Sequence, residues 1–165
     1  RLFGAHTHQF ILCFSSRGRV YWLKGYEVPQ GTRTGRGKPI VNLFPLEEGE
    51  RINAVLPVQG FDDAHYVFMA TANGTVKKTP LSDFSRPMKK GIIAVDLEPG
   101  DYLIGAAITD GRHDVMLFSD AGKAVRFEEE DVRPMGRAAR GVRGMRLGDD
   151  QRVVSMLVAD DETRT

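Results

Sequence analysis

The chain has 165 residues, 41% of them hydrophobic, which is enough for the core of one domain or of part of a larger one. Its formal net charge of +1 says little about partners, so only the local distribution of charge is informative. A single cysteine, Cys13, excludes an internal disulfide, and the absence of a signal peptide or of an apolar run near ~20 residues predicts a soluble, cytoplasmic protein.

The first predicted element is a β-hairpin over residues 11–20. An apolar run around Cys13 leads to a polar turn that ends at Gly18, and the second apolar run reaches Tyr21 and Trp22. We expect Cys13 to be a buried structural thiol, and the two aromatic residues to pack in the core or between neighbouring units. Because the chain begins at Arg1 rather than Met and reaches this hairpin almost at once, we expect a fragment of a longer protein.

The same pattern of strand, polar turn and strand recurs around Gly74 and Gly122. Asn73-Gly74 between two apolar runs is a strong hairpin signal, because both residues tolerate a positive φ. Each turn glycine is followed by an apolar anchor, a basic residue before a glycine, a leucine and a final strand. The anchors are Val28, Phe84 and Val132; the basic pairs are Arg36-Gly37, Lys90-Gly91 and Arg140-Gly141; the leucines are Leu43, Leu97 and Leu147; the final strands are 51–58, 102–109 and 152–159.

This spacing defines repeats of about 50 residues with roughly four strands each, which we place at 7–59, 64–110 and 112–161. Such a period predicts an all-β fold built as a propeller-like array of antiparallel blades. Three blades are too few for a closed ring, so we expect an open arc or part of a larger disc; a single many-stranded barrel is the alternative. Residues 128–131, all acidic, predict one turn of helix or a charged loop, with little helix elsewhere.

Positive charge gathers at the equivalent place in each repeat. Equivalent positions of a bladed array share one rim, so the clusters predict a continuous basic stripe, with the acidic segments around Glu47, Asp96 and Asp149 on another face. Lys and Arg neutralise phosphates, and glycine permits a polyanion backbone to approach closely. The alternative is that these charges only solvate strand edges. The candidate DNA-binding residues are Arg17, Arg19, Arg33, Arg36, Lys38, Lys77, Lys78, Lys89, Lys90, Arg137, Arg140 and Arg143, and the candidate structural turn residues are Gly18, Gly74 and Gly122.

Motifs for other chemistry are incomplete in this sequence. Residues 31–38 resemble a phosphate loop, but the spacing between its glycines is one residue too long and Pro39 replaces the required Ser or Thr. His6 and His8 lack a ligand-spaced Cys or carboxylate, and residues 128–131 lack the glycine and spacing of a calcium loop. We therefore expect no catalytic residue, no metal site and no cofactor in this chain.

Several segments closely resemble the C-terminal domain of the bacterial DNA gyrase A subunit: Thr7 to Tyr21, Arg36 to Leu43, Phe68 to Thr79 and Gly141 to Gly148. The resemblance implies a β-pinwheel, a propeller-like disc of about six four-stranded blades whose outer rim carries wrapped DNA. The partners that it implies are double-stranded DNA, the remaining blades, the N-terminal cleavage core and the gyrase B subunit. It also implies a nucleoid-associated location and a part in negative supercoiling driven by ATP on the B subunit.

The box that characterises this family, Gln-Arg-Arg-Gly-Gly-Lys-Gly, has no full copy here; its nearest matches are residues 31–37, 85–91 and 135–141. The resemblance places the box upstream of Arg1 and the catalytic tyrosine in an N-terminal region outside this chain. It therefore implies a non-catalytic DNA-binding and DNA-bending segment of a type II topoisomerase. The alternatives are a protein-interaction propeller without DNA binding and the equivalent domain of topoisomerase IV.

Overall fold

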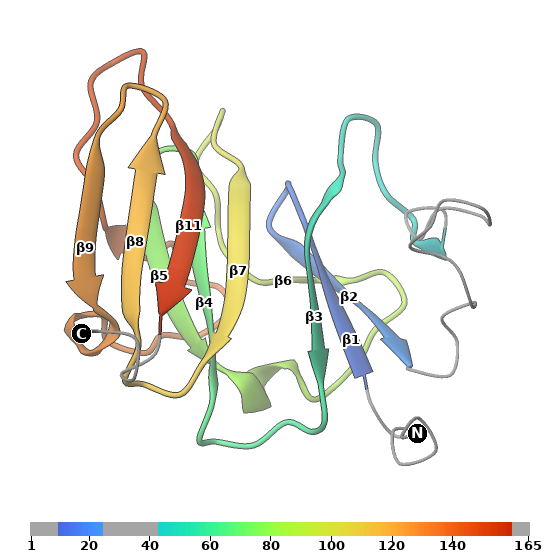
Figure 1. Ribbon diagram of the computed structural model, residues 1–165. Helices are drawn as coiled ribbons and strands as arrows, with labels where there is room; N and C mark the ends of the chain where they lie inside the picture. Colours follow the sequence, from blue (N-terminus) through green and yellow to red (C-terminus); the bar gives the residue numbers. More distant parts are fainter. Residues whose placement is uncertain (1–9, 25–42, 160–165) are drawn as a thin grey trace, which may run out of the picture.

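The computed structural model describes residues 10–24 and 43–159, and the strands of this part form three antiparallel sheets (Figure 1). The first sheet has the order β3-β1-β2-β6, and the second has the order β10-β5-β4-β7. The third has the order β11-β8-β9. The strands are β1 (Phe10–Ser15), β2 (Arg19–Lys24), β3 (Ile52–Val58), β4 (Tyr66–Thr71), β5 (Thr75–Pro80), β6 (Ile92–Ile93), β7 (Leu103–Thr109), β8 (Asp114–Ser119), β9 (Ala124–Glu128), β10 (Val142–Arg143) and β11 (Val153–Ala159). Two 3-10 turns, η5 (Leu81–Phe84) and η6 (Glu129–Asp131), accompany them. The three separate sheets confirm the all-β class and exclude the single barrel.

Each predicted hairpin forms around its glycine. The turns between β1 and β2, β4 and β5, and β8 and β9 place Gly18, Gly74 and Gly122 at φ values of 80°, 93° and 80°, which favour glycine. A hydroxyl at the start of each turn braces the loop: the oxygens of Ser15, Thr71 and Ser119 accept the backbone N–H groups of Arg17, Thr75 and Ala121. The hairpin prediction is therefore confirmed.

The sequence repeat and the structural blade do not coincide. The outer strand of the first sheet is β6, which belongs to the second repeat and pairs with β2 through Val20 and Ile92. The outer strand of the second sheet is β10, which belongs to the third repeat and pairs with β5 through Val76 and Val142. Each of these two blades therefore takes three strands from one repeat and its fourth from the next.

The turn glycines also dock this incoming segment. The carbonyl oxygen of Gly18 accepts the N–H groups of Ala94 and Val95 at 2.7 and 3.3 Å. That of Gly74 accepts those of Gly144 and Met145 at 2.7 and 3.2 Å. The two hairpins thus hold neighbouring repeats together through the backbone as well as through side chains.

Hydrophobic cores lie between successive blades. On β4, Val67 and Met69 point into a core shared with the first blade, whereas Phe68 and Ala70 point into a core shared with the third. Side chains alternate across a strand, so a strand covered on both faces must be apolar throughout. The Trp22 Nε1–H donates to the Phe84 carbonyl at 2.9 Å, which confirms that Trp22 packs between units.

The innermost strands of the three blades, β3, β7 and β11, lie side by side (Figure 1). The opposite edges of the sheets end in β6, β10 and β9. The described chain is therefore a propeller-like arc with an inner and an outer edge. No helix within residues 10–24 and 43–159 has the length and apolar character needed to cross a membrane.

Candidate nucleic-acid interface

Four of the predicted basic residues flank the outer strands of the arc. Lys89 and Lys90 precede β6, Arg140 precedes β10, and Arg143 lies within β10; all four side chains are exposed. The strand exchange is what carries them to the outer edge, because β6 and β10 are added outside the hairpin of the preceding repeat. The predicted residues Arg33, Arg36 and Lys38 lie outside the described residues.

Arg19 and Arg137 are half-buried and join neighbouring blades. The Arg19 Nη1 donates to the carbonyl of Lys90 at 3.2 Å, and the Arg137 Nη1 donates to the carbonyl of Ile93 at 3.4 Å. The segment around β6 is thus bound by one arginine from the preceding repeat and one from the following repeat. These arginines therefore hold the outer strand in position and present only part of their surface to solvent.

Lys77 and Lys78 are buried, so the prediction that they contact phosphates is wrong. The Lys77 ammonium donates to the carbonyls of Ala94 and Arg137 at 2.6 and 2.5 Å. Burial, helped by the nearby Arg137 charge, lowers the pKa of Lys77 from 10.5 to about 8. Lys78 donates to the Glu129 carbonyl at 3.1 Å and lies over the Tyr66 ring. Both lysines join segments of the second and third repeats.

The glycine after each basic residue packs against protein. A Cβ atom on Gly91 would lie 2.6 Å from the Tyr21 ring, and one on Gly141 would lie 2.4 Å from the carbonyl oxygen of Val76. The sequence predicts that these glycines let a polyanion approach. The structure corrects this for Gly91 and Gly141: their missing side chains let one repeat approach the second strand of the preceding blade.

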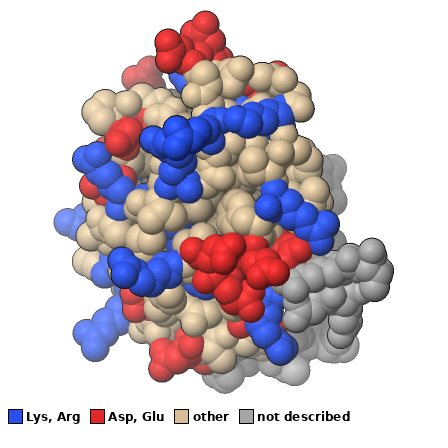
Figure 2. Space-filling view, turned by 90° about the vertical axis from the view of Figure 1, so that its left-hand side faces the viewer, with Lys and Arg blue, Asp and Glu red and all other residues tan. Residues whose placement is uncertain are grey.

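Acidic side chains lie beside the basic ones. Arg140 pairs with Asp96 at 3.1 Å and with Glu98 at 3.4 Å, and Arg17 pairs with Glu47 at 2.8 Å. The prediction that the acidic segments lie on another face is therefore wrong. Figure 2 shows Lys and Arg in separate groups with Asp and Glu next to them. Each paired side chain is about half exposed, so these pairs contribute little to stability, on the order of 0–1 kcal/mol, and can exchange with other anions.

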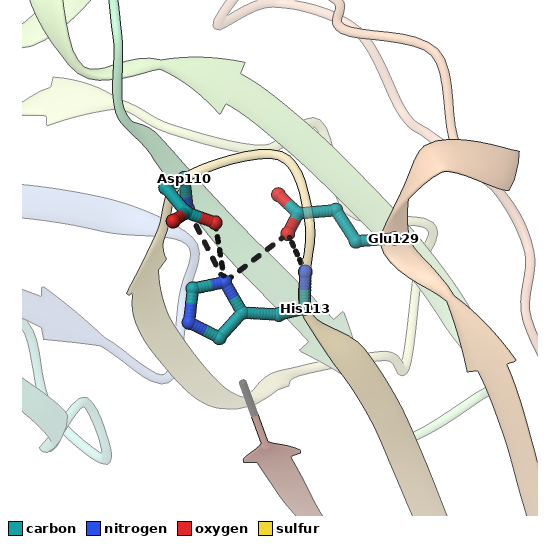
Figure 3. Close-up of side chains that lie close together, drawn as sticks. All are labelled: Asp110, His113 and Glu129. Atoms are coloured by element: carbon teal, nitrogen blue, oxygen red, sulfur yellow. Dashed lines mark hydrogen bonds and ion pairs between the residues drawn. The ribbon is translucent and has the colours of Figure 1, made fainter. Parts of the chain in front are cut away.

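A polar cluster that the sequence did not reveal lies where β7, β8 and η6 meet (Figure 3). The His113 Nδ1 is 3.0 Å from an oxygen of Asp110 and 3.5 Å from an oxygen of Glu129. Glu129 is fully buried, and its carboxylate also accepts the Thr109 hydroxyl and the backbone N–H of His113. Sixteen residues separate His113 from Glu129, so no local motif joins them.

The sequence matches one family model along most of its length. The family described as DNA gyrase C-terminal domain, beta-propeller, matches residues 9–59, 65–110 and 113–160. The chain is 59% identical to the DNA gyrase A subunit of Klebsiella oxytoca over 99% of this chain and 19% of that protein. It is 58% identical to the DNA gyrase A subunit of Escherichia coli K12 over 96% of this chain and 18% of that protein. The chain thus spans about a fifth of the length of the curated relatives it matches.

Two solved structures share the fold over 92% of the chain. The C-terminal domain of DNA topoisomerase IV superposes with a TM-score of 0.82 at 27% identity, over 47% of that domain. The DNA gyrase A C-terminal domain superposes with a TM-score of 0.73 at 28% identity, over 48% of that domain. The chain is therefore similar to about half of each domain, and the β-pinwheel prediction is confirmed.

Proposed function

Because this chain belongs to the DNA gyrase C-terminal domain family, we propose that it is a segment of a gyrase A subunit that binds and bends duplex DNA along the outer edge of its blades. The observation that carries this proposal is the position of Lys89, Lys90, Arg140 and Arg143. Strand exchange between repeats brings them to the outer edge, and their side chains are exposed. The edge supplies exposed positive charge along two successive blades.

Binding of this kind depends on the DNA backbone. Lysine and arginine on an exposed edge neutralise phosphates and release counterions, which makes affinity strongly dependent on salt. Such contacts position a duplex but do not read its sequence, so any preference among sequences comes from how easily the DNA bends. Arg17 and Arg140 join this surface by exchanging the carboxylates they now contact for phosphates.

The wider role concerns the whole gyrase protein. The curated relatives carry the name of the DNA gyrase A subunit, and this chain is similar to a fifth of their length. We assign this segment a non-catalytic part in an ATP-dependent type II topoisomerase. It presents bent DNA to the N-terminal cleavage core of its own polypeptide, works with the gyrase B subunit, and so supports negative supercoiling. Double-stranded DNA and the remaining blades are its direct partners.

The test is a charge reversal at the outer edge. The triple variant Lys89→Glu, Lys90→Glu and Arg143→Glu should bind long duplex DNA more weakly, and the slope of log affinity against log salt should fall by about 0.9 for each phosphate that the variant no longer neutralises. The matched control is Arg51→Glu, an exposed arginine beside the inner strand β3, which should leave the slope unchanged. An unchanged slope in the triple variant would refute the proposal.

The same titration separates the alternative functions. A protein-interaction module would show no salt-dependent DNA binding, and its binding to a partner protein would persist at high salt. A topological wrapping assay on closed circular DNA then separates binding from wrapping. A wrapping segment of gyrase type changes the topology of the DNA, whereas a segment that only binds DNA does not.

A further inference from the structure

The cluster of Asp110, His113 and Glu129 has the spacing of ligands around a single metal ion. One donor atom from each residue lies within 4.8 Å of the others, and the two distances from the His113 Nδ1 are 3.0 and 3.5 Å. Ligand atoms around a tetrahedral ion with bonds of about 2.0–2.2 Å lie about 3.3–3.6 Å apart. A small shift of the exposed Asp110 side chain would bring all three donors to such distances.

The surrounding bonds hold the buried Glu129 carboxylate in place, whereas the exposed Asp110 carboxylate has one backbone partner of its own. One carboxylate oxygen of Glu129 accepts the Thr109 hydroxyl and lies 4.0 Å from the Lys78 ammonium. The other accepts the His113 backbone N–H at 2.9 Å and faces the imidazole (Figure 3). An oxygen of Asp110 accepts the Arg112 backbone N–H at 3.0 Å, and this bond lowers the pKa of the Asp110 carboxyl. Bonds of this kind orient ligands in metal sites.

An ion at this cluster would share His113 with the groups that already surround it. Carboxylate oxygens of Asp110 and Glu129 lie 3.0 and 3.5 Å from its Nδ1, which also accepts the Asp110 backbone N–H at 3.3 Å. The Lys78 ammonium lies 4.0 Å from the other Glu129 oxygen, and the Arg112 charge acts on Asp110. A divalent ion bound by the imidazole and both carboxylates would replace the contacts that now join the three side chains. Asp110 is about two-fifths exposed and His113 about one-sixth, so an ion can enter from solvent.

We propose that Asp110, His113 and Glu129 bind a first-row divalent metal ion of the zinc class, with water completing the coordination. One imidazole nitrogen with two carboxylate oxygens favours zinc over magnesium or calcium, which prefer oxygen ligands alone. The ion would join the turn between β7 and β8 to η6, next to Lys78 of β5. The bound ion would therefore link the second blade to the third. This proposal does not rest on the proposed DNA-binding function.

The test is a calorimetric titration of the chelator-treated chain with Zn²⁺, in the His6→Gln and His8→Gln background so that these two histidines cannot contribute. Cys13 is fully buried in the first blade and does not compete as a ligand. We expect one equivalent to bind. Binding should weaken at least about tenfold in His113→Gln and also in Asp110→Asn, whose exposed position makes it the milder change. It should weaken with falling pH, because a histidine ligates only when neutral.

The matched control is His65→Gln, because His65 is an exposed histidine that contacts Asp62. This variant should bind Zn²⁺ like the parent chain. Zn²⁺ at about a hundredfold excess over its dissociation constant should raise the unfolding midpoint of the parent by roughly 5–10 °C and leave that of His113→Gln unchanged. The absence of Zn²⁺ binding, equal binding to His113→Gln, or a preference for Ca²⁺ or Mg²⁺ would overturn the proposal.

Discussion

The change Gly74→Ala should destabilise this chain more than the same change at Gly122. At Gly74 the φ of 93° costs an alanine about 1–2 kcal/mol, because a Cβ atom crowds the following carbonyl. The new Cβ would also lie 2.6 Å from the Met145 carbonyl oxygen. The incoming segment must then move, which weakens the two bonds from Gly144 and Met145 to the Gly74 carbonyl, each contributing about 1 kcal/mol. The expected loss is therefore about 3–4 kcal/mol.

Gly122 provides the matched control within the same chain. Its φ is 80°, but no atom lies within 4 Å of an added Cβ, so Gly122→Ala should cost about 1–2 kcal/mol from backbone strain alone. Urea unfolding of the two variants and the parent gives both values. Gly18→Ala should follow Gly74→Ala, since its Cβ would lie 2.7 Å from the Val95 carbonyl oxygen. Equal losses at Gly74 and Gly122 would show that the turn does not dock the next repeat.

Three other changes test separate parts of the structure. The pKa of Lys77 is lower in the folded chain (about 8) than in the unfolded one (10.5), so the folded state binds fewer protons between these pH values. The parent should therefore gain stability relative to Lys77→Met as pH rises from 8 to 10.5, by up to about 3 kcal/mol. A difference in unfolding free energy between the two that does not change with pH in urea unfolding would contradict this. Trp22→Phe removes the bond to the Phe84 carbonyl and should cost about 1–2 kcal/mol in urea unfolding, whereas no loss would argue against a bond between blades. The double change Asp96→Asn and Glu98→Gln frees Arg140 and should tighten DNA binding at low salt in a filter assay; unchanged affinity would place Arg140 outside the DNA contact.

The hairpins and the two-sided core were predictable because their signals are local. A glycine at the end of a polar turn and an unbroken apolar run such as residues 67–70 each have one good structural explanation. The strand exchange was not predictable, because Ile92-Ile93 is too short to signal its partner and that partner lies in another repeat. The hydrogen bonds between β6 and β2 form only when neighbouring repeats pack together.

The sequence contains an indication that Lys77 is buried, although the charge pattern alone suggests that it is exposed. In the repeat alignment Lys77 is equivalent to Tyr21 and Val125, an aromatic and an aliphatic residue, which is typical of a position that faces the protein. A count of lysines and arginines treats every basic residue as exposed. Comparison of equivalent positions would have separated Lys77 from Lys90 and Arg140, whose equivalents are basic throughout. The position of Glu129 left no such signal, because its partners come from three separate segments.

The strand exchange also bears on how an outer edge of this kind would bend DNA. Arginines from both neighbouring repeats bind the backbone around Lys90. Arg19 of the preceding repeat donates to the Lys90 carbonyl, and Arg137 of the following repeat donates to the Ile93 carbonyl. Gly91, the residue after Lys90, packs directly on Tyr21. The backbone that carries Lys90 is therefore anchored at the contact between two blades. Under the proposed function the angle between blades sets the spacing of the cations on the outer edge. A duplex that follows them must then adopt the curvature of the arc, and any change that loosens the contacts between blades should reduce bending before it reduces binding.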